Sequence, residues 1–254
     1  MTAATVKICG LREPETLRSI LHLPIDHIGF VFAKSKRQVT PQQAAEMIRV
    51  LEQRRESGLQ TPLSVGVFVE PEREQLAALM QMARLDVIQL HSKESPELCA
   101  WIKETFPGVQ VWKVISVTQA QHSGEKEAGS PESGKENFAP AKKDGLAGEA
   151  ERAVAAVLEP YRSVVDAILL DTHDPVYGGG SGQTFAWDAI PPYRRWCSEA
   201  GIKLLVAGGL QADNVEELVE AYIPDGVDVS SGVETEGIKD VKKITSFVER
   251  VKHT

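Results

Sequence analysis

The sequence predicts a closed barrel of eight parallel β-strands, each followed by an α-helix, and two observations lead to this fold class. Eight short runs rich in β-branched residues recur along the chain, and a helix-length amphipathic segment follows each run. The length of 254 residues also agrees with the size of about 250 residues that is typical of such barrels. A doubly wound open sheet is the alternative that the same alternation allows.

The eight predicted strands follow one another at 5–9, 27–32, 63–69, 87–91, 109–116, 167–171, 203–209 and 226–231. Between them lie segments such as PQQAAEMIRVLEQRRE and PEREQLAALMQMARL, in which apolar residues recur at spacings of three and four and the other face is charged. This periodicity is typical of the crossover helices that parallel strands require. We therefore expect residues 1–254 to form a single (β/α)₈ TIM-barrel domain.

One segment interrupts the alternation after the fifth predicted strand. Residues 118–150 are dominated by Gly, Ser, Pro, Lys and Glu, and Phe138 is their only aromatic residue. Such a composition buries too little apolar surface to offset the entropy of ordering, so we expect a low-complexity, flexible insertion within the domain. Whether it is a lid over the catalytic face or a passive loop stays open, and it gives no reason to expect a second domain.

Composition narrows the possible partners and the compartment. The formal net charge is -8 and no basic stripe is present, which disfavours nucleic acid and favours a small solute. Cys9, Cys99 and Cys197 form neither a disulfide framework nor a zinc-site spacing, so a reducing compartment fits best. The N-terminus lacks a signal peptide, and no stretch is apolar over the roughly 18 residues of a membrane span. We expect a cytoplasmic protein without a membrane partner.

Several polar side chains are predicted at the mouth of the barrel, because alternate strand residues point inward and the last of them line the site. Lys7 and Cys9 share the inner face of the first strand, Gln89 and His91 are paired on the fourth, and Asp171 ends the sixth. Each has an ordinary explanation: a lone Cys is usually a small buried hydrophobe, and an Asp after a strand is often a cap.

Together, however, Cys9 and Asp171 are suited to proton transfer on a sugar. A thiolate is a competent base when a nearby cation lowers its pKa, and a carboxylic acid can donate a proton if its surroundings keep it protonated. Opposed across the mouth, the two residues would form a pair of acid and base.

Glycine-rich turns after the last three strands indicate a phosphorylated ligand. Backbone amides after strands seven and eight form the recurrent phosphate site of these barrels, although plain tight turns are the alternative. The candidate residues lie in YGGGSGQTFAW, AGGL and VSSGVE and are Gly179, Gly180, Ser181, Gly182, Gly208, Gly209, Ser230, Ser231 and Gly232.

The loop after the second predicted strand, AKSKRQVT, brings Lys34, Lys36 and Arg37 to the same face. An Arg side chain is well shaped to bind a carboxylate with two hydrogen bonds. A solvated basic loop is the other explanation, and the spacing alone does not choose between them.

These motifs resemble one family. KICG, GFVFAKSKRQV, VGVFV, VIQLH, LLDT, GGSGQTFAW, AGGL with DN after it, and VDVSSGVE together resemble phosphoribosylanthranilate isomerase. The resemblance runs from Val6 to about Val251 and is interrupted only by the insertion. Two departures are small: GGSG replaces the usual GGTG, and Ala186 stands where an acidic residue is usual.

The resemblance implies a barrel of the ribulose-phosphate-binding type and an isomerase of the aldose–ketose type, active in tryptophan biosynthesis. The implied reaction is the Amadori rearrangement of N-(5'-phosphoribosyl)anthranilate to 1-(2-carboxyphenylamino)-1-deoxyribulose 5-phosphate, without a metal or an organic cofactor. By the same resemblance Cys9 is the general base and Asp171 the general acid. Arg37 would bind the anthranilate carboxylate, His91 would be a polar contact to the substrate, and the glycine-rich turns would bind its phosphate.

Other functions remain open at this point. A barrel with the same phosphate site could catalyse a different reaction, as in indole-glycerol-phosphate synthase or the histidine-pathway isomerase, although the latter is expected to have a carboxylate in place of Cys9. A non-catalytic phosphosugar-binding barrel is expected to lack Cys9 or Asp171. Cys9 could also be a nucleophile or a redox thiol, but no His is near it in sequence. The chain ends favour a free-standing enzyme, whereas its oligomeric state and association with other tryptophan-pathway enzymes are not predicted.

Overall fold

The computed structural model describes residues 3–117, 143–172 and 186–254, and its eight parallel strands close into a barrel in the order of the sequence. The strands are β1 (Thr5–Cys9), β2 (His27–Val31), β3 (Leu63–Phe68), β4 (Val87–Leu90), β5 (Gln110–Val117), β6 (Ala167–Thr172), β7 (Lys203–Val206) and β8 (Gly226–Val229). The predicted fold class is therefore confirmed. The predicted boundaries differ mainly at the ends of β7 and β8, where the AGG and SS residues lie beyond the strands.

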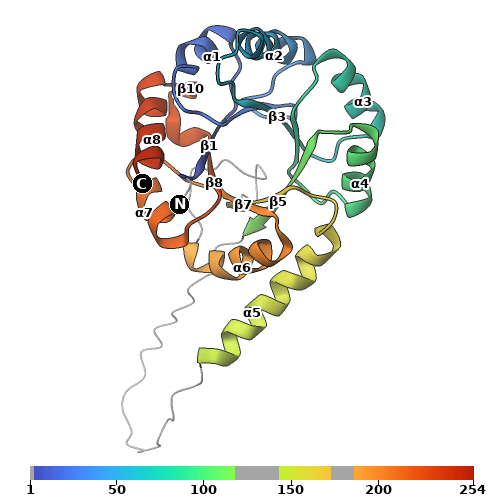
Figure 1. The fold of residues 1–254 in the computed structure, drawn as a ribbon, viewed down its shortest axis with the longest axis vertical. Coiled ribbons are helices and arrows are strands. Elements are labelled where there is room, and N and C mark those ends of the chain that lie inside the picture. Colours follow the sequence, from blue (N-terminus) through green and yellow to red (C-terminus); the bar gives the residue numbers. More distant parts are fainter. Residues whose placement is uncertain (1–2, 118–142, 173–185) are drawn as a thin grey trace, which may run out of the picture.

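Helices surround the barrel as an outer ring (Figure 1). They are α1 (Pro14–Ile20), α2 (Pro41–Glu56), α3 (Arg73–Met82), α4 (Pro96–Thr105), α5 (Lys143–Leu158), α6 (Ile190–Ala200), α7 (Val215–Tyr222) and α8 (Val241–His253). Local sequence explains several of their ends: α1, α2, α4 and α6 have Pro in the first turn, where its missing N–H costs nothing. Thr40 and Gln43 form a capping box on α2.

Three 3₁₀ turns and a short hairpin complete the described chain. The turns are η1 (Glu159–Tyr161), η2 (Trp187–Ala189) and η3 (Ser231–Val233). After η3, β9 (Glu234–Thr235) pairs antiparallel with β10 (Ile238–Lys239). Only Ser230 and η3 separate this hairpin from the carboxyl end of β8, so it lies beside the mouth of the barrel.

The insertion predicted over 118–150 is described only in part. Residues 118–142 lie outside the described residues, whereas 143–150 form the first half of α5. The sequence AGEAERAVAAV explains this helix, because Ala, Glu and Arg are good helix formers and no proline interrupts them. The N-terminal end of α5 projects away from the ring of helices (Figure 1).

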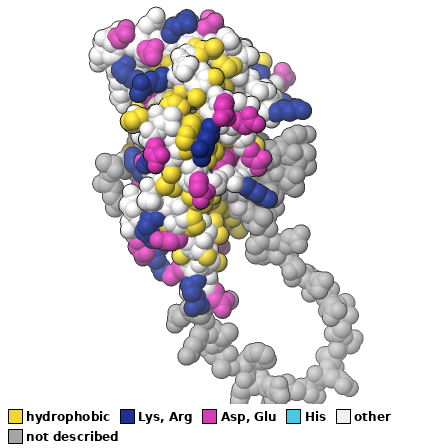
Figure 2. All heavy atoms as spheres, turned by 90° about the vertical axis from the view of Figure 1, so that its right-hand side faces the viewer, with side chains coloured by type: hydrophobic (Ala, Val, Ile, Leu, Met, Phe, Trp, Pro, Cys, Tyr) yellow, Lys and Arg dark blue, Asp and Glu magenta, His cyan; other side chains and the backbone are white. Residues whose placement is uncertain are grey.

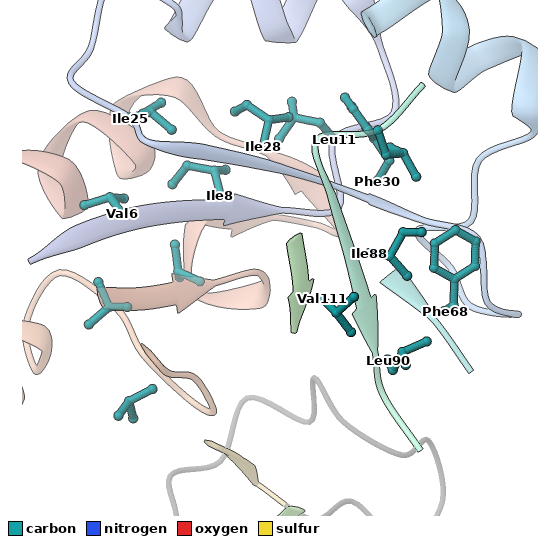
Figure 3. Close-up of a cluster of buried hydrophobic side chains, with 14 of the residues drawn as sticks. Val6, Ile8, Leu11, Ile25, Ile28, Phe30, Phe68, Ile88, Leu90 and Val111 are labelled. Atoms are coloured by element: carbon teal, nitrogen blue, oxygen red, sulfur yellow. The ribbon is translucent and has the colours of Figure 1, made fainter. Parts of the chain in front are cut away.

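The hydrophobic core has two parts, as the alternation of strand residues requires. Outward residues such as Val6, Ile8, Ile28 and Phe30 pack between the strands and the helices (Figure 3). Inside the barrel a smaller cluster is formed by Val65, Val87, Trp112, Val114, Ala167, Leu169, Leu205 and Ala207. Because Ile8 faces outward, Lys7 and Cys9 on either side of it face inward, as predicted.

At the amino ends of the strands the barrel is closed by a repeated contact. An Asp immediately precedes each even-numbered strand, and its Oδ2 accepts a hydrogen bond from the backbone N–H of the second residue of the preceding odd-numbered strand. The donor and acceptor residues are Val6 and Asp26, Ser64 and Asp86, Val111 and Asp166, and Leu204 and Asp225, at 2.7 to 2.8 Å. Four equivalent contacts thus join the strands in pairs at the end opposite the mouth.

The surface over α3 and α4 mixes basic and acidic side chains and shows no patch of one sign (Figure 2). Among the described residues, none of the helices is both long and apolar enough to span a membrane.

Candidate active site

A cavity of about 150 Å³ opens at the carboxyl ends of the strands. The structure brings eight of the predicted site residues to its wall: Cys9, Arg37, His91, Asp171, Gly208, Gly209, Ser230 and Ser231. Gly232 does not line this cavity but lies next to Ser231 in η3. Gly179, Gly180, Ser181 and Gly182 lie outside the described residues. The position of the cavity is the one that functional sites take in this fold.

Cys9 ends β1, and its thiol lies above a buried ion pair. Lys7 is fully buried inside the barrel, and its Nζ donates a hydrogen bond to Asp228 Oδ2 at 2.8 Å. Burial alone would lower the pKa of Lys7, but Asp228 and Cys9 outweigh that effect and the net shift is upward. Lys7 therefore remains an ammonium beneath the thiol.

A glycine makes room for this arrangement. A Cβ added to Gly29 of β2 would lie 2.8 Å from the Cys9 Sγ and 3.2 Å from the Lys7 Nζ. Gly29 is paired with Cys9 in the register of β1 and β2, so the two residues are neighbours on the inner face. The absence of a side chain at Gly29 leaves the space that the thiol and the ammonium occupy.

The environment of Cys9 raises the pKa of its thiol. Burial is the largest cause and Asp228 adds to it, whereas the charges of Lys7 and Lys239 act in the opposite direction. The neighbouring ammonium expected from the sequence is present, but it does not lower the thiol pKa overall, because the cost of desolvating a thiolate is larger. In the unliganded site the thiol is the favoured form at neutral pH.

Asp171 ends the inner face of β6 and contacts His91. Its Oδ1 accepts the backbone N–H of Thr172 at 2.8 Å, and its Oδ2 lies 3.3 Å from His91 Nε2. The His91 Nε2 does not have the alignment of a hydrogen bond in this contact. On the other side of the imidazole, Gln89 Nε2 lies 3.5 Å from Nδ1. His91 is thus beside the carboxyl group as well as in the cavity wall.

A buried ion pair holds the backbone around His91. Lys113 and Glu94 are almost fully buried, and Lys113 Nζ lies 3.1 Å from Glu94 Oε2. The same ammonium donates to the carbonyl oxygens of Leu90 and Ser92, which flank His91. Sequence reasoning did not identify this pair, because an inward Lys on β5 gives no sign of the loop that it contacts.

Arg37 lines the cavity rather than lying in a solvated basic loop. Its side chain is 23% exposed, and its Nε and Nη2 donate to the two carboxylate oxygens of Glu234 at 2.7 and 2.8 Å. Lys34 also lines the cavity, whereas Lys36 is exposed and does not. Of the three basic residues in this loop, Arg37 is the one that a second group orients.

The glycines after β7 and β8 let two loops approach each other closely. Gly208 and Gly209 have φ values of +89° and +62°, which residues with a side chain rarely adopt. A Cβ on Gly232 would lie 1.9 Å from the carbonyl oxygen of Leu210. Ser230 donates its hydroxyl to the carbonyl oxygen of Cys9 at 3.2 Å, which ties β8 to β1.

Sequence reasoning missed four residues near this cavity: Gly29, Asp228, Glu234 and Lys239. Signals for two of them were present, because Asp228 stands two residues before Ser230 in the sequence and Glu234 ends the SSGVE motif. The sequence held no signal for Gly29 or Lys239, because their roles depend on contacts with residues of other segments. Among the described residues, no three His, Cys, Asp or Glu side chains converge as a metal-binding group would require.

Comparison with known proteins places most of the chain in one family. The family model described as N-(5'-phosphoribosyl)anthranilate isomerase matches residues 6–130 and 138–250. The isomerase of Brevibacillus brevis is 38% identical over 247 residues, which cover 97% of this chain and 93% of the relative. That of a Thermoanaerobacter species is 34% identical over 248 residues, with 97% of each chain covered.

Solved structures agree as well. The crystal structure of phosphoribosylanthranilate isomerase from Thermotoga maritima matches with a TM-score of 0.71 and 32% identity, covering 99% of this chain and 100% of the other. A second isomerase structure, a complex with reduced 1-(o-carboxyphenylamino)-1-deoxyribulose 5-phosphate, matches with a TM-score of 0.69 and 30% identity. The match of the family model to most of the chain and the identity to full-length relatives show that the chain belongs to the N-(5'-phosphoribosyl)anthranilate isomerase family of tryptophan biosynthesis.

Proposed function

We propose that the chain performs the family's Amadori rearrangement of N-(5'-phosphoribosyl)anthranilate with Asp171 as general acid and Cys9 as general base. The observation that carries this assignment is their placement in one cavity wall, on strands β6 and β1, with the Lys7 ammonium beneath the thiol. A carboxyl group and a thiol that face one cavity can serve two different atoms of one bound sugar.

In the first step Asp171 protonates the furanose ring oxygen. The C1'–O bond breaks, the anthranilate nitrogen supplies the electron pair, and the sugar opens to a protonated Schiff base. His91 lies beside Asp171, where its imidazole contacts the carboxyl group that has lost its proton. The hydrogen bond from the Thr172 backbone N–H holds the Asp171 carboxyl group in place at the end of β6.

In the second step the Cys9 thiolate removes the proton from C2'. The electrons of the C–H bond form the double bond of an enolamine, and tautomerisation of that enolamine gives the ketone. The raised pKa of Cys9 means that little thiolate is present before reaction, but that each thiolate is a strong base. Lys7 supplies the positive charge that stabilises the thiolate when it forms.

The remaining contacts bind the two ends of the substrate. Arg37 would bind the anthranilate carboxylate, and its position in the cavity wall supports this role. The backbone amides of Gly208, Gly209, Ser231 and Gly232, together with residues 179–182, would bind the phosphate, and His91 would contact the sugar. Support comes from the related isomerase whose complex contains a ligand with both a carboxyphenyl group and a 5-phosphate.

The test is the loss of anthranilate fluorescence from freshly made phosphoribosylanthranilate, with wild type compared with Cys9→Ala and Asp171→Asn. A general acid or base contributes a factor of about 10²–10⁴, so we expect a loss of at least this size in each variant. Cys99→Ala is the matched control, because Cys99 is a buried thiol on α4 that does not line the cavity. Its activity should equal that of the wild type.

The alternative function, a phosphosugar-binding barrel without chemistry, makes a different prediction. An inactive wild type that still binds the reduced product analogue would support that alternative and contradict the acid and base roles. Circular dichroism on each variant separates a lost catalytic group from a lost fold. Full activity in either folded active-site variant would remove that residue from the mechanism.

A further inference from the structure

The hairpin after β8 carries a carboxylate that is shared by two cations. Glu234 Oε1 accepts from Arg37 Nε at 2.7 Å and from Lys239 Nζ at 2.7 Å, and its Oε2 accepts from Arg37 Nη2 at 2.8 Å. Glu234 and Lys239 are both nearly buried, with side chains 7% and 5% exposed. Although burial favours the neutral acid, these contacts lower the pKa of Glu234 to about 2, so it is ionised under working conditions.

The pairing leaves one edge of the Arg37 guanidinium free. A guanidinium has five N–H donors in a fixed plane, and Glu234 uses the edge formed by Nε and Nη2. Within the described residues, no hydrogen bond uses Nη1, so the edge formed by Nη1 and the second Nη2 donor remains open. A second carboxylate could therefore bind Arg37 with two hydrogen bonds without displacing Glu234.

The charges of the three groups leave the site attractive to an anion. Two cations and one carboxylate give a net charge of one positive unit where Arg37 meets the cavity. An Arg37 without Glu234 would keep its charge, but its long side chain would adopt several rotamers, and ordering such a chain on binding costs free energy. Because Glu234 already holds Arg37 in one orientation, the free-energy cost of ordering this side chain is not added when the ligand binds.

The rest of the molecule fixes this carboxylate in turn. Lys239 Nζ donates to the carbonyl oxygen of Ser230 at 2.8 Å, and the Ser230 hydroxyl donates to the carbonyl oxygen of Cys9. The stem of Arg37 lies over Gly10, where an added Cβ would be 2.7 Å from the Arg37 Cδ. The guanidinium is thus held from both sides and connected to the end of the strand that carries the thiol.

We propose that Glu234, held by Lys239, is a positioning residue that presents the open edge of Arg37 to the carboxylate of the substrate. This inference rests on the proposed function, because it requires a carboxylated ligand in the cavity. Glu234 does not touch the reacting atoms, so it acts through Arg37. A defect at Glu234 should therefore weaken binding of the carboxylated end and leave the proton transfers intact.

The experiment measures binding of two ligands to wild type and to Glu234→Gln. One ligand is the reduced product analogue with its carboxyphenyl group, and the other is the same molecule with a plain phenyl group. We expect Glu234→Gln to weaken the first about tenfold, of the order seen when one charged hydrogen bond is lost, and to leave the second unchanged. In turnover, KM should rise and kcat should stay near the wild-type value, as for a loss of uniform binding.

Two controls separate positioning from general damage. Glu216→Gln makes the same chemical change at an exposed pair with Arg250, neither of which lines the cavity, and should affect neither ligand. In an Arg37→Met background, Glu234→Gln should add no further loss, because its effect passes through Arg37.

The possible failures are distinguishable. Equal weakening of both ligands, or additive losses in the double variant, would overturn the positioning role while the proposed function stands. Unchanged binding of the carboxylated ligand to Glu234→Gln would likewise overturn the positioning role and leave the proposed function standing. A wild type that binds neither ligand would overturn both this inference and the proposed function.

Discussion

Cys9 is a residue at which burial and charge act in opposite directions on one thiol. Its alternation with Ile8 was sufficient to predict that it faces the interior beside Lys7. The direction of the net pKa shift was not predictable from the sequence. It depends on the burial of the thiol in the closed barrel and on the charges of Asp228 and Lys239. The same limit explains why Arg37 was predicted as a clamp but Glu234 was not identified as its partner.

The raised thiol pKa predicts how Cys9 itself titrates in the free enzyme. The ordinary pKa of a thiol is 9.0 and that of Cys9 lies above it, so the rate at which iodoacetamide alkylates Cys9 should still be rising with pH beyond 9.0. Alkylation depends on the thiolate alone, whereas kcat/KM also requires the protonated form of Asp171 and does not isolate the thiol. The measurement is the alkylation rate against pH, with Cys9→Ala as the control that lacks the reactive thiol.

A plateau already reached near neutral pH would contradict this expectation. It would mean that Lys7 and Lys239 outweigh burial and that the thiolate is present before the substrate binds. The mechanism would keep its acid and base, but Cys9 would act as a weaker and more abundant base.

At the scale of the elements, the strands were predicted well because each is a local pattern. Their carboxyl ends were predicted less well: the AGG after β7 continues the apolar run but turns away, since Gly208 and Gly209 have positive φ. Helix α5 begins within a segment that average composition describes as low-complexity, because composition over a long window hides a short Ala-rich stretch at its end. The loops of the site depend on contacts between strands that no local pattern contains.

The aspartates before the even-numbered strands show how sequence and topology combine. Asp86 accepts hydrogen bonds from both the backbone N–H and the hydroxyl of Ser64, each at 2.8 Å. Asp86→Ala removes these acceptors at the end of the barrel opposite the active site. We expect a decrease of about 1–3 kcal/mol in the free energy of unfolding, the typical cost of leaving a buried donor without a partner, and an unchanged kcat.

Urea unfolding and a turnover assay on the same preparation check this prediction. Glu52→Ala is a suitable control, because Glu52 is exposed on α2 and its removal should change the free energy of unfolding little. A loss of kcat in Asp86→Ala that matches its loss of stability would show that the two ends of the barrel are coupled. An unchanged stability would show that water replaces the carboxylate at this position.

For the whole molecule, the sequence was sufficient to predict the fold class because an alternation of eight strands and helices leaves few topologies. Right-handed crossovers and short connections remove most of the others. The register around the barrel was not predictable in the same way. It sets which inward residues share a layer, for example Ser116 beside Asp171 and Lys7 beside Asp228. Only the closed structure brings Cys9 and Asp171 to one cavity.

The pH dependence of stability is a property of the whole fold, and His27 at the closed end of the barrel should dominate it in mild acid. Burial, the largest cause, lowers the pKa of His27 from 6.5 to about 4. Its ring lies edge-on to Trp112, with centroids 4.8 Å apart. Below pH 6.5 the unfolded chain gains a proton at His27 that the folded chain does not accept until about pH 4.

This contribution to stability is therefore complete above pH 6.5 and is lost as the pH falls toward 4, by about 3 kcal/mol in total. Glu234, whose pKa lies near 2, adds its own loss only below its ordinary value of 4.5. The interval between pH 6.5 and 4.5 thus isolates His27. Urea unfolding across it should show a steep decrease for wild type and a much shallower one for His27→Leu, which has no proton to gain. Parallel decreases in the two proteins would show that other groups control the acid sensitivity of the barrel.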